Sequence, residues 1–412
     1  PKVRAELAYV TDDSKALYFA ANDLDPASNT IYRWDLADGT KALVFDEPGR
    51  WRIVDPLGAR WLMEKQLGDA HVEVYEYELA TKKLTPLLGQ GEVHELDVRY
   101  GARSGQVLVR TNKLGDFEQL YALEGGKLTP IGKPSAHEVA AFAIDDARSR
   151  IYTTEYVDGY ARVHVLDART LRTIELPRLP DAENQTFAGV SRNGRFVQIT
   201  IDSARLAPTT VVWDWKSRKL ETWRPPATPE IDVSAFAPVA LETYPARDGT
   251  TISMYVRRPA KCEEPCPVVV ELHAGPKGRA RPGFDPYAQL FVDAGFVFVQ
   301  PNVRRAKVAI TDIEDVSRHI RSAWAKDGKA PKIGVLGPSY GGYAALIAMT
   351  DFAGAFDAGV AEYPMKDKDA ADELSPIAHL AKLKAPLLVI QGVHDPRTPI
   401  ADALQIHDEL ER

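Results

Sequence analysis

Up to about residue 225, short apolar and aromatic segments alternate with polar turns, a pattern typical of β-strands. A strand, a turn and a second strand recur in five units, at residues 31–44, 74–88, 120–131, 163–176 and 211–223, and their turns lie about 43 to 48 residues apart. This spacing is that of a four-stranded propeller blade, because one small sheet hides both faces only by packing against neighbours. We therefore predict a β-propeller over residues 1–230, with a sandwich of short strands as the alternative. Five blades are few, so we expect a small propeller or blades that precede Pro1.

Residues 223–230 are rich in proline and predict a connector between two domains. Beyond it, near-continuous apolar runs predict strands that are buried on both faces, at residues 267–273, 296–300, 332–336, 358–361 and 386–391. Apolar positions recur with helical spacing over 310–324, and helix-forming runs follow at 344–350 and 401–411. Thr311 and Glu314 predict a capping box at the start of the first helix. This alternation predicts an α/β domain with a mostly parallel sheet over residues 231–412.

The composition adds limits to this picture. With 412 residues, 45% of them hydrophobic and 26% charged, the chain is an ordinary globular protein of two or three domains. A net charge of -7 without a basic, aromatic-rich block argues against nucleic acid as a partner. No apolar run approaches the roughly 20 residues of a membrane-spanning helix. We expect a soluble protein whose signal peptide, if it had one, is absent from the sequence.

Both cysteines, Cys262 and Cys266, lie in one proline-containing loop. Two free thiols and a local disulfide both fit this spacing, and the confinement of both cysteines to one loop favours the disulfide. An oxidising compartment is then favoured, so we expect a periplasmic or secreted protein rather than a cytoplasmic one. A zinc site is disfavoured, because two sulfurs without a second Cys or His pair leave a tetrahedral ion short of ligands. We predict neither a metal nor another cofactor.

The strongest chemical signal is the segment 337–342, Gly-Pro-Ser-Tyr-Gly-Gly, between a predicted strand and a predicted helix. A serine between glycines at such a junction predicts a nucleophile elbow, since the strained turn needs small neighbours and raises Ser339 Oγ above the sheet. The N-terminus of the following helix favours developing negative charge there. A serine in an ordinary glycine turn is the alternative, which the flanking strand and helix disfavour.

A serine nucleophile needs a base and a carboxylate that orients the base, in the chain order Ser, Asp, His for this fold. Asp395 is the candidate carboxylate because it follows the strand 386–391, at the edge where open α/β sheets place functional groups. The alternative is a turn residue that caps the helix starting near Ile400. For the oxyanion hole, we predict the N–H of Tyr340 and that of Gly275, which lies in the loop 273–276. A simple β-turn is the other interpretation of that loop.

Three motifs together resemble the prolyl oligopeptidase family of serine peptidases, above all its acylaminoacyl-peptidase and dipeptidyl-peptidase branches: residues 337–343, His273-Ala-Gly-Pro276 and Gly392-x-x-Asp395. The first half resembles the family only as a propeller before a hydrolase. The resemblance implies acylation of Ser339, short peptides as substrates and a propeller that restricts access. It also suggests His273 as a further oxyanion donor, at the position of a tyrosine in dipeptidyl relatives. Their Asp-Trp-x-Tyr-Glu-Glu signature is not in this sequence, which argues against that specificity.

The sequence departs from this family at the catalytic histidine, which in the family follows the aspartate by a strand and a loop. We assign none of His319, His379, His394 and His407: they lie in predicted helices, before the Asp-bearing strand, or directly beside Asp395. The hydrolase half is also short for a fold of eight strands, and residues 302–310 are shorter than the Gly- and Tyr-containing loop that the family carries there. We therefore expect an incomplete record of a longer protein, and a measured mass equal to 45.5 kDa would contradict this. An esterase or lipase, and a propeller interaction protein with an inactive hydrolase domain, remain as alternatives.

Overall fold

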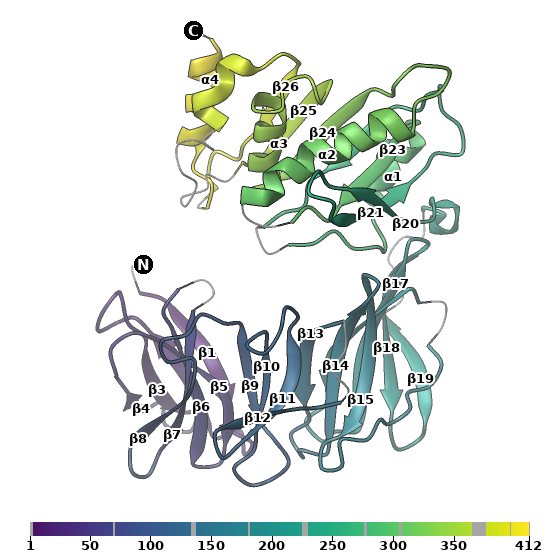
Figure 1. The fold of residues 1–412 in the computed structure, drawn as a ribbon. Coiled ribbons are helices and arrows are strands. Elements are labelled where there is room, and N and C mark those ends of the chain that lie inside the picture. The colour runs from purple at the N-terminus through teal and green to yellow at the C-terminus, as the bar shows by residue number, and fades with distance from the viewer. Residues whose placement is uncertain are drawn as a thin grey trace. The chain divides into compact units, whose positions relative to one another are not determined.

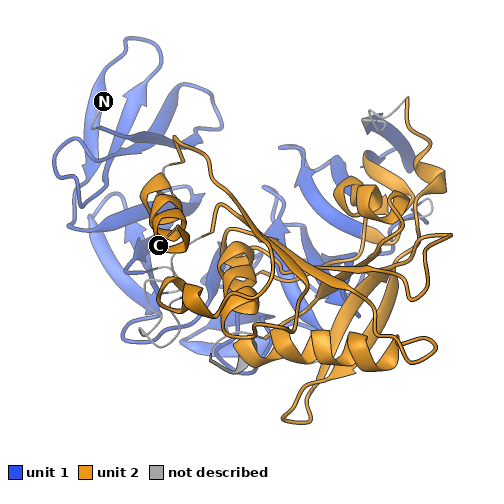
Figure 2. Ribbon diagram, turned by 90° about the horizontal axis from the view of Figure 1, so that it is seen from above, with its two compact units in different colours: residues 1–180, 185–200, 210–223 blue, residues 181–184, 201–209, 224–412 orange. Residues whose placement is uncertain are grey.

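The computed structural model describes residues 3–68, 71–132, 137–179, 182–224, 230–275, 278–304, 307–364, 376–395 and 397–411. Most of the predicted connector, at 225–229, and Pro276 of the predicted oxyanion loop lie outside these residues. The chain forms two compact units (Figure 2). Unit 1 contains residues 1–180, 185–200 and 210–223, and unit 2 contains residues 181–184, 201–209 and 224–412.

The first half of the chain folds into small antiparallel sheets that follow one another in sequence (Figure 1). Their strands are β1 (Ala5–Val10), β2 (Ala16–Ala21), β3 (Thr30–Asp35) and β4 (Lys41–Phe45); β5 (Arg50–Leu57), β6 (Arg60–Gln66), β7 (Val72–Glu78) and β8 (Lys83–Leu88); β9 (Leu96–Tyr100), β10 (Val107–Thr111), β11 (Gln119–Glu124) and β12 (Lys127–Pro130); β13 (Glu138–Ile144), β14 (Arg150–Val157) and β15 (Tyr160–Asp167); and β16 (Asn184–Val190), β17 (Phe196–Ser203), β18 (Leu206–Asp214) and β19 (Lys219–Arg224). This succession is that of a β-propeller, as the repeats predict.

Each predicted repeat contains the last strands of one sheet. The fourth repeat, 163–176, differs: it contributes β15 and one isolated bridge, between Leu166 and Thr173, so its sheet has three strands in the described part of the chain. Pro177 follows shortly after and cannot donate a ladder hydrogen bond, which limits a fourth strand.

Buried side chains join successive sheets of unit 1. Phe45 of the first sheet meets Trp51 of the second edge to face, with ring centroids 5.1 Å apart. Two further buried clusters join the second sheet to the third and the third to the fourth. An ion pair adds to these contacts: Arg148, between β13 and β14, donates to both carboxylate oxygens of Asp55 on β5, at 2.8 and 2.9 Å. Each of the first four sheets thus buries side chains against its neighbour, as expected for a repeat architecture.

Unit 2 is built on a seven-stranded sheet of the described residues, in the order β20-β21-β23-β22-β24-β25-β26. The strands are β20 (Ala240–Pro245), β21 (Thr251–Arg257), β22 (Val268–Glu271), β23 (Val297–Pro301), β24 (Ile333–Pro338), β25 (Ala358–Glu362) and β26 (Leu387–Ile390). The last five match the predicted strands and pair in parallel, whereas β20 and β21, which the sequence did not reveal, pair antiparallel at one edge. The α/β prediction is confirmed.

Helices cover both faces of this sheet. They are α1 (Pro286–Asp293), α2 (Lys307–Ala323), α3 (Tyr340–Thr350) and α4 (Ile400–Leu410), with short 3-10 segments η1 (Val233–Ala235) and η3 (Pro376–Lys382). One face packs on α1 and the other on α2 and α3, which is why the central strands are apolar throughout. The predicted capping box is wrong: α2 begins at Lys307, so Thr311 lies inside the helix, because residues 307–310 contain no proline or glycine to stop it.

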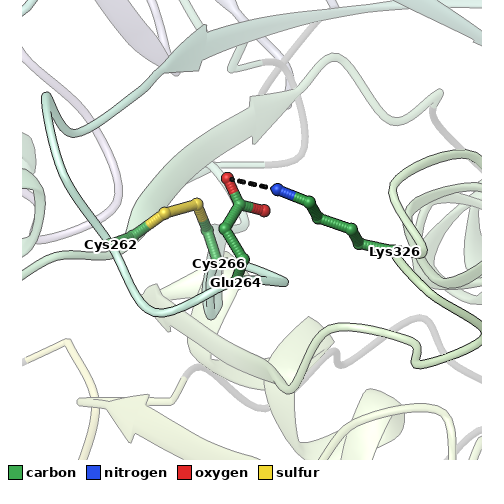
Figure 3. Close-up of a disulfide and its surroundings, with 4 residues drawn as sticks. All are labelled: Cys262, Glu264, Cys266 and Lys326. Carbon is green, nitrogen blue, oxygen red and sulfur yellow. Dashed lines mark ion pairs between the residues drawn. A yellow bond between two sulfur atoms is a disulfide. The ribbon is translucent and has the colours of Figure 1, made fainter.

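Cys262 and Cys266 form the disulfide that the sequence favoured. Figure 3 shows the loop that it closes, in which Glu264 Oε1 lies 3.5 Å from Lys326 Nζ. Both charged side chains of this ion pair are about half exposed, so the pair adds little stability. In the described part of the chain, no helix combines the length and the apolar character that crossing a membrane would require.

Candidate functional site at the carboxyl edge of the sheet

Ser339 has the backbone conformation of a nucleophile elbow. Its φ of 57° and ψ of -114° lie in a region that residues with a side chain rarely adopt. Its N–H donates to Glu362 O of the neighbouring strand at 2.9 Å, and α3 begins at the next residue, Tyr340. The Ser339 side chain makes no hydrogen bond that caps the helix. The predicted strand, turn and helix are therefore all present, with the strain concentrated on the serine.

Three glycines make this turn sterically possible. A Cβ at Gly337 would lie 2.5 Å from Gly341 C, and one at Gly342 would lie 2.7 Å from Glu362 O. A Cβ at Gly341 would lie 2.0 Å from Leu272 O, at the end of the strand that leads to the predicted oxyanion loop. All three obstacles are backbone atoms, which cannot move aside as a flexible side chain can. The elbow thus depends on the close approach of backbone segments, which glycine permits because it has no Cβ.

Five parallel strands end at one edge of the sheet, and three of them lead to predicted site residues. His273 follows β22, Ser339 follows β24 and Asp395 follows β26. The connections run in opposite directions from β22 and β24, since α1 leads from β22 to β23 on one side and α3 leads from β24 to β25 on the other. Such a topological switch point is the usual place for a binding site in an open α/β sheet.

The loop after β22 is tightly folded. Gly275 has a φ of 70°, and its carbonyl accepts a hydrogen bond from Gly278 N at 2.9 Å. A Cβ at Gly278 would lie 1.9 Å from Ala274 O, so this position also requires glycine. The Nε2 atom of His273 is buried and has no hydrogen-bond partner among the described residues. The predicted oxyanion donors, Gly275 with His273 beside it, thus belong to a constrained turn near the elbow.

Asp395 closes a turn directly after β26. Its Oδ1 accepts from the backbone N–H groups of Arg397 and Thr398 at 2.8 and 3.1 Å, and these hydrogen bonds lower the pKa of the carboxyl below its usual range. The Thr398 side chain also lowers this pKa by hydrogen bonding, so the turn after β26 holds the carboxyl in place. Asp395 does not cap α4, whose N-cap residue is Pro399. Asp395 is thus a turn residue before α4 but not its cap, and its role as the catalytic carboxylate stays a prediction.

No described histidine contacts Asp395. The ring of His379 pairs with Asp351, with Nδ1 and Oδ1 2.7 Å apart. His319 lies on α2 against the ring of Tyr244, where burial lowers its pKa. His394 and His407 are exposed. The structure thus places Ser339, Asp395 and the loop after β22 at one edge of the sheet, and none of the described histidines forms a hydrogen bond with Asp395.

Sequence reasoning missed a group of polar residues on the α1 side of the same edge. Tyr287 Oη donates to Glu362 Oε1 at 3.0 Å, and burial together with Glu362 raises the pKa of Tyr287 to about 12. Tyr363, directly after β25, has a φ of 34° and donates its N–H to Ile390 O. Gln300 and Glu271 complete this group. The sequence signal that could have revealed this group is a polar residue at the carboxyl end of an apolar strand, as at Glu271 and Glu362.

The fold and this edge define a class of protein: an α/β-hydrolase domain that follows a β-propeller. A sequence model of the prolyl oligopeptidase family matches residues 282–372, which include the elbow. Dipeptidyl aminopeptidase BIII of Pseudoxanthomonas mexicana is 25% identical over 495 aligned residues, covering 98% of this chain and 68% of the relative. An uncharacterised peptidase of Bacillus subtilis strain 168 is 25% identical over 41% of this chain and 32% of its own length.

Solved structures agree on the fold. A prolyl endopeptidase superposes with a TM-score of 0.82 at 16% identity, covering 99% of this chain and 68% of that one. A puromycin-hydrolysing peptidase of Mycobacterium tuberculosis gives a TM-score of 0.80 at 18% identity, covering 99% and 73%. These similarities support the resemblance to the prolyl oligopeptidase family that the sequence motifs carry. The alignment of 495 residues also exceeds the 412 of this chain, so the Pseudoxanthomonas relative has segments within the aligned region that this sequence lacks.

Proposed function

We propose that the protein is a serine peptidase that cleaves short peptides through an acyl-enzyme on Ser339. The observation that supports this most is the strained backbone of Ser339, held by three obligatory glycines at the switch point of the sheet. Strain of this kind costs about 1–3 kcal/mol and persists only where the surroundings enforce it. It is expected where a hydroxyl must be presented above a helix N-terminus, and it has no evident structural use here.

In the proposed reaction, Ser339 Oγ attacks the scissile carbonyl carbon while a histidine base takes its proton. The carbonyl electrons move onto oxygen, and the N–H groups of Tyr340 and Gly275 stabilise the resulting oxyanion. The intermediate collapses, the amine leaves with the proton from the histidine, and water then hydrolyses the ester. Asp395 Oδ2 orients the base and stabilises its charged form. The proposal requires a histidine beside Asp395, which none of the described histidines provides.

Labelling of the full-length natural protein by a fluorophosphonate probe tests this proposal. The probe reacts with activated serines, so wild type should be labelled, Ser339→Ala should not, and Asp395→Asn should react far more slowly. Absence of labelling in folded wild type would contradict the proposal. It would support a propeller protein with an inactive hydrolase domain, the one alternative favoured by a specific observation, the unassigned base.

Substrate choice is the finer part of the proposal. By family resemblance, we propose that the propeller restricts access, so that cleavage should slow as peptides lengthen. The similarity to a dipeptidyl aminopeptidase favours release of short N-terminal units, whereas the missing signature of that branch argues against it. Matched peptides with free and acetylated N-termini would decide between the two. Turnover of an ester but not of the amide with the same acyl group would instead indicate an esterase.

A further inference from the structure

A partly buried polar layer lies on the α1 side of the sheet, directly before the predicted oxyanion loop. Val269 and Phe298 pack under α1, and side chains alternate along a strand, so Glu271 and Gln300 face the same side two residues later. Both are the residues at which β22 and β23 change from apolar to polar. The layer therefore starts where the apolar packing under α1 ends.

Gln300 connects this layer through each of its polar atoms. Its Nε2 donates to Glu271 Oε2 at 2.6 Å and to Asp285 Oδ2 at 3.1 Å, while its Oε1 accepts from a terminal nitrogen of Arg257 at 2.7 Å. Because carboxylates only accept and arginine only donates, these partners determine which terminal atom of the Gln300 amide is nitrogen and which is oxygen. Arg257 is 2% exposed, and its other terminal nitrogen donates to Gly283 O at 2.8 Å. Asp285 also caps α1 through Ala288 N.

Glu271 stands between this network and the candidate site. The next residue, Leu272, donates its N–H to Leu336 O at 2.8 Å, and its carbonyl oxygen is the atom nearest to where a Cβ on Gly341 of the elbow would lie. The following residues form the loop with His273 and Gly275. Only Leu272 therefore separates Glu271 from the predicted oxyanion loop, and the same residue lies against α3 at Gly341.

We propose that Glu271, held by Gln300, is a positioning residue that sets the oxyanion loop relative to Ser339. This inference rests on the proposed function. Glu271 does not touch the substrate: its carboxyl anchors the end of β22, and the rigid anchor gives Gly275 N–H its geometry. A displacement of about 1 Å at such a donor is enough to lower a rate roughly 10²-fold.

The charge of Glu271 offers a second readout. Burial raises the pKa of Glu271, and the nearby carboxylates of Asp285 and Glu362 act in the same direction, against Gln300 and Arg257. Tyr287 is the other titratable group of α1 close to these acids. As pH rises through the raised pKa, a negative charge appears close to the oxyanion and opposes it. The rate of wild type relative to Glu271→Gln should therefore fall with rising pH over that range.

The experiment compares the full-length wild type with Glu271→Leu, Glu271→Gln and Gln300→Ala, with Glu242→Leu on the exposed edge strand β20 as the control. Glu271→Leu and Gln300→Ala should lower kcat about 10- to 100-fold with KM nearly unchanged, and should slow fluorophosphonate labelling in parallel, because the probe uses the same oxyanion hole. Glu271→Gln keeps an acceptor for Gln300, so it should stay within about 3-fold of wild type. Glu242→Leu should have no effect.

Thermal unfolding of each variant separates lost positioning from lost folding. If Glu271→Leu does not fold, Gln300→Ala carries the same test, since it removes the donor and leaves the carboxyl in place. Wild-type kcat in either folded variant, or a loss in Glu271→Gln as large as that in Glu271→Leu, would overturn the inference alone. Absence of labelling in wild type would overturn the proposed function and this inference with it.

Discussion

Gly341→Ala tests whether the elbow and the oxyanion loop form one packed unit. The new methyl group would lie 2.0 Å from Leu272 O, 3.0 Å from Leu272 C and 3.1 Å from His273 O. All three are backbone atoms at the end of β22, and ordinary contacts of this kind begin near 3.4 Å. Either α3 or the start of the oxyanion loop must therefore move by more than an ångström.

A shift of this size at either partner should reduce kcat/KM by at least about 10²-fold, because Ser339 Oγ and the oxyanion donors would no longer meet the same carbonyl. The overpacking should also lower the free energy of unfolding by about 1–3 kcal/mol. The assay is the rate of fluorophosphonate labelling together with peptide turnover, and circular dichroism verifies the fold. Gly334→Ala in β24, the strand that leads to the elbow, is the matched control, since its methyl group would meet nothing closer than 3.9 Å.

Gly341→Ala with wild-type labelling and turnover would refute the reasoning, since it would mean that the loop after β22 and the nucleophile helix move independently. Loss of activity in Gly334→Ala of the same size would refute it as well, because any added methyl group near the elbow would then suffice. A loss confined to Gly341→Ala assigns the effect to the Leu272 contact.

Three further predictions concern the rest of the molecule. Asp55→Asn should lower the free energy of unfolding of the propeller, measured in urea, by about 3–5 kcal/mol, because it leaves the largely buried Arg148 without a carboxylate. The double variant Asp55→Leu with Arg148→Leu, which removes both charges, should lower it by less. Replacing both cysteines by serine should cost roughly 2 kcal/mol by the same measurement, since the disulfide closes a loop of only a few residues. Asp395→Asn should destabilise the protein above pH 3.8, and this difference should fade as pH falls through the lowered pKa of Asp395, as denaturation at two pH values would show.

The sequence alone was sufficient for the central strands and for the propeller repeats. Parallel strands covered on both faces read as continuous apolar runs, so their positions needed no knowledge of the fold. β20 and α1 carry weaker signals. β20 lies at the edge with most of its residues exposed, and α1 is only eight residues long, too short for a clear helical period. The positions of edge strands and short helices depend on contacts with distant residues, which the local sequence pattern does not indicate.

The polar layer under the oxyanion loop marks a different limit. Glu271 lies inside a correctly predicted strand, but its partner Gln300 is 29 positions away and Asp285 lies 15 positions before Gln300. Such contacts exist only once β22 and β23 are paired and α1 is docked. A pattern along the chain indicates that a polar residue ends an apolar strand, and it cannot indicate which atoms satisfy that residue.

The elbow illustrates what the sequence motif could predict and what the structure adds to it. From the sequence, small residues around Ser339 were expected simply to permit a tight turn. In the structure each glycine opposes a different backbone segment: Gly337 opposes the first turn of α3, Gly342 opposes β25, and Gly341 opposes the end of β22. The strained serine is thus held from three directions, so substituting any one of these glycines should relax Ser339 toward an ordinary φ before it unfolds the domain. A substitution at one of these glycines should therefore abolish activity before it unfolds the domain.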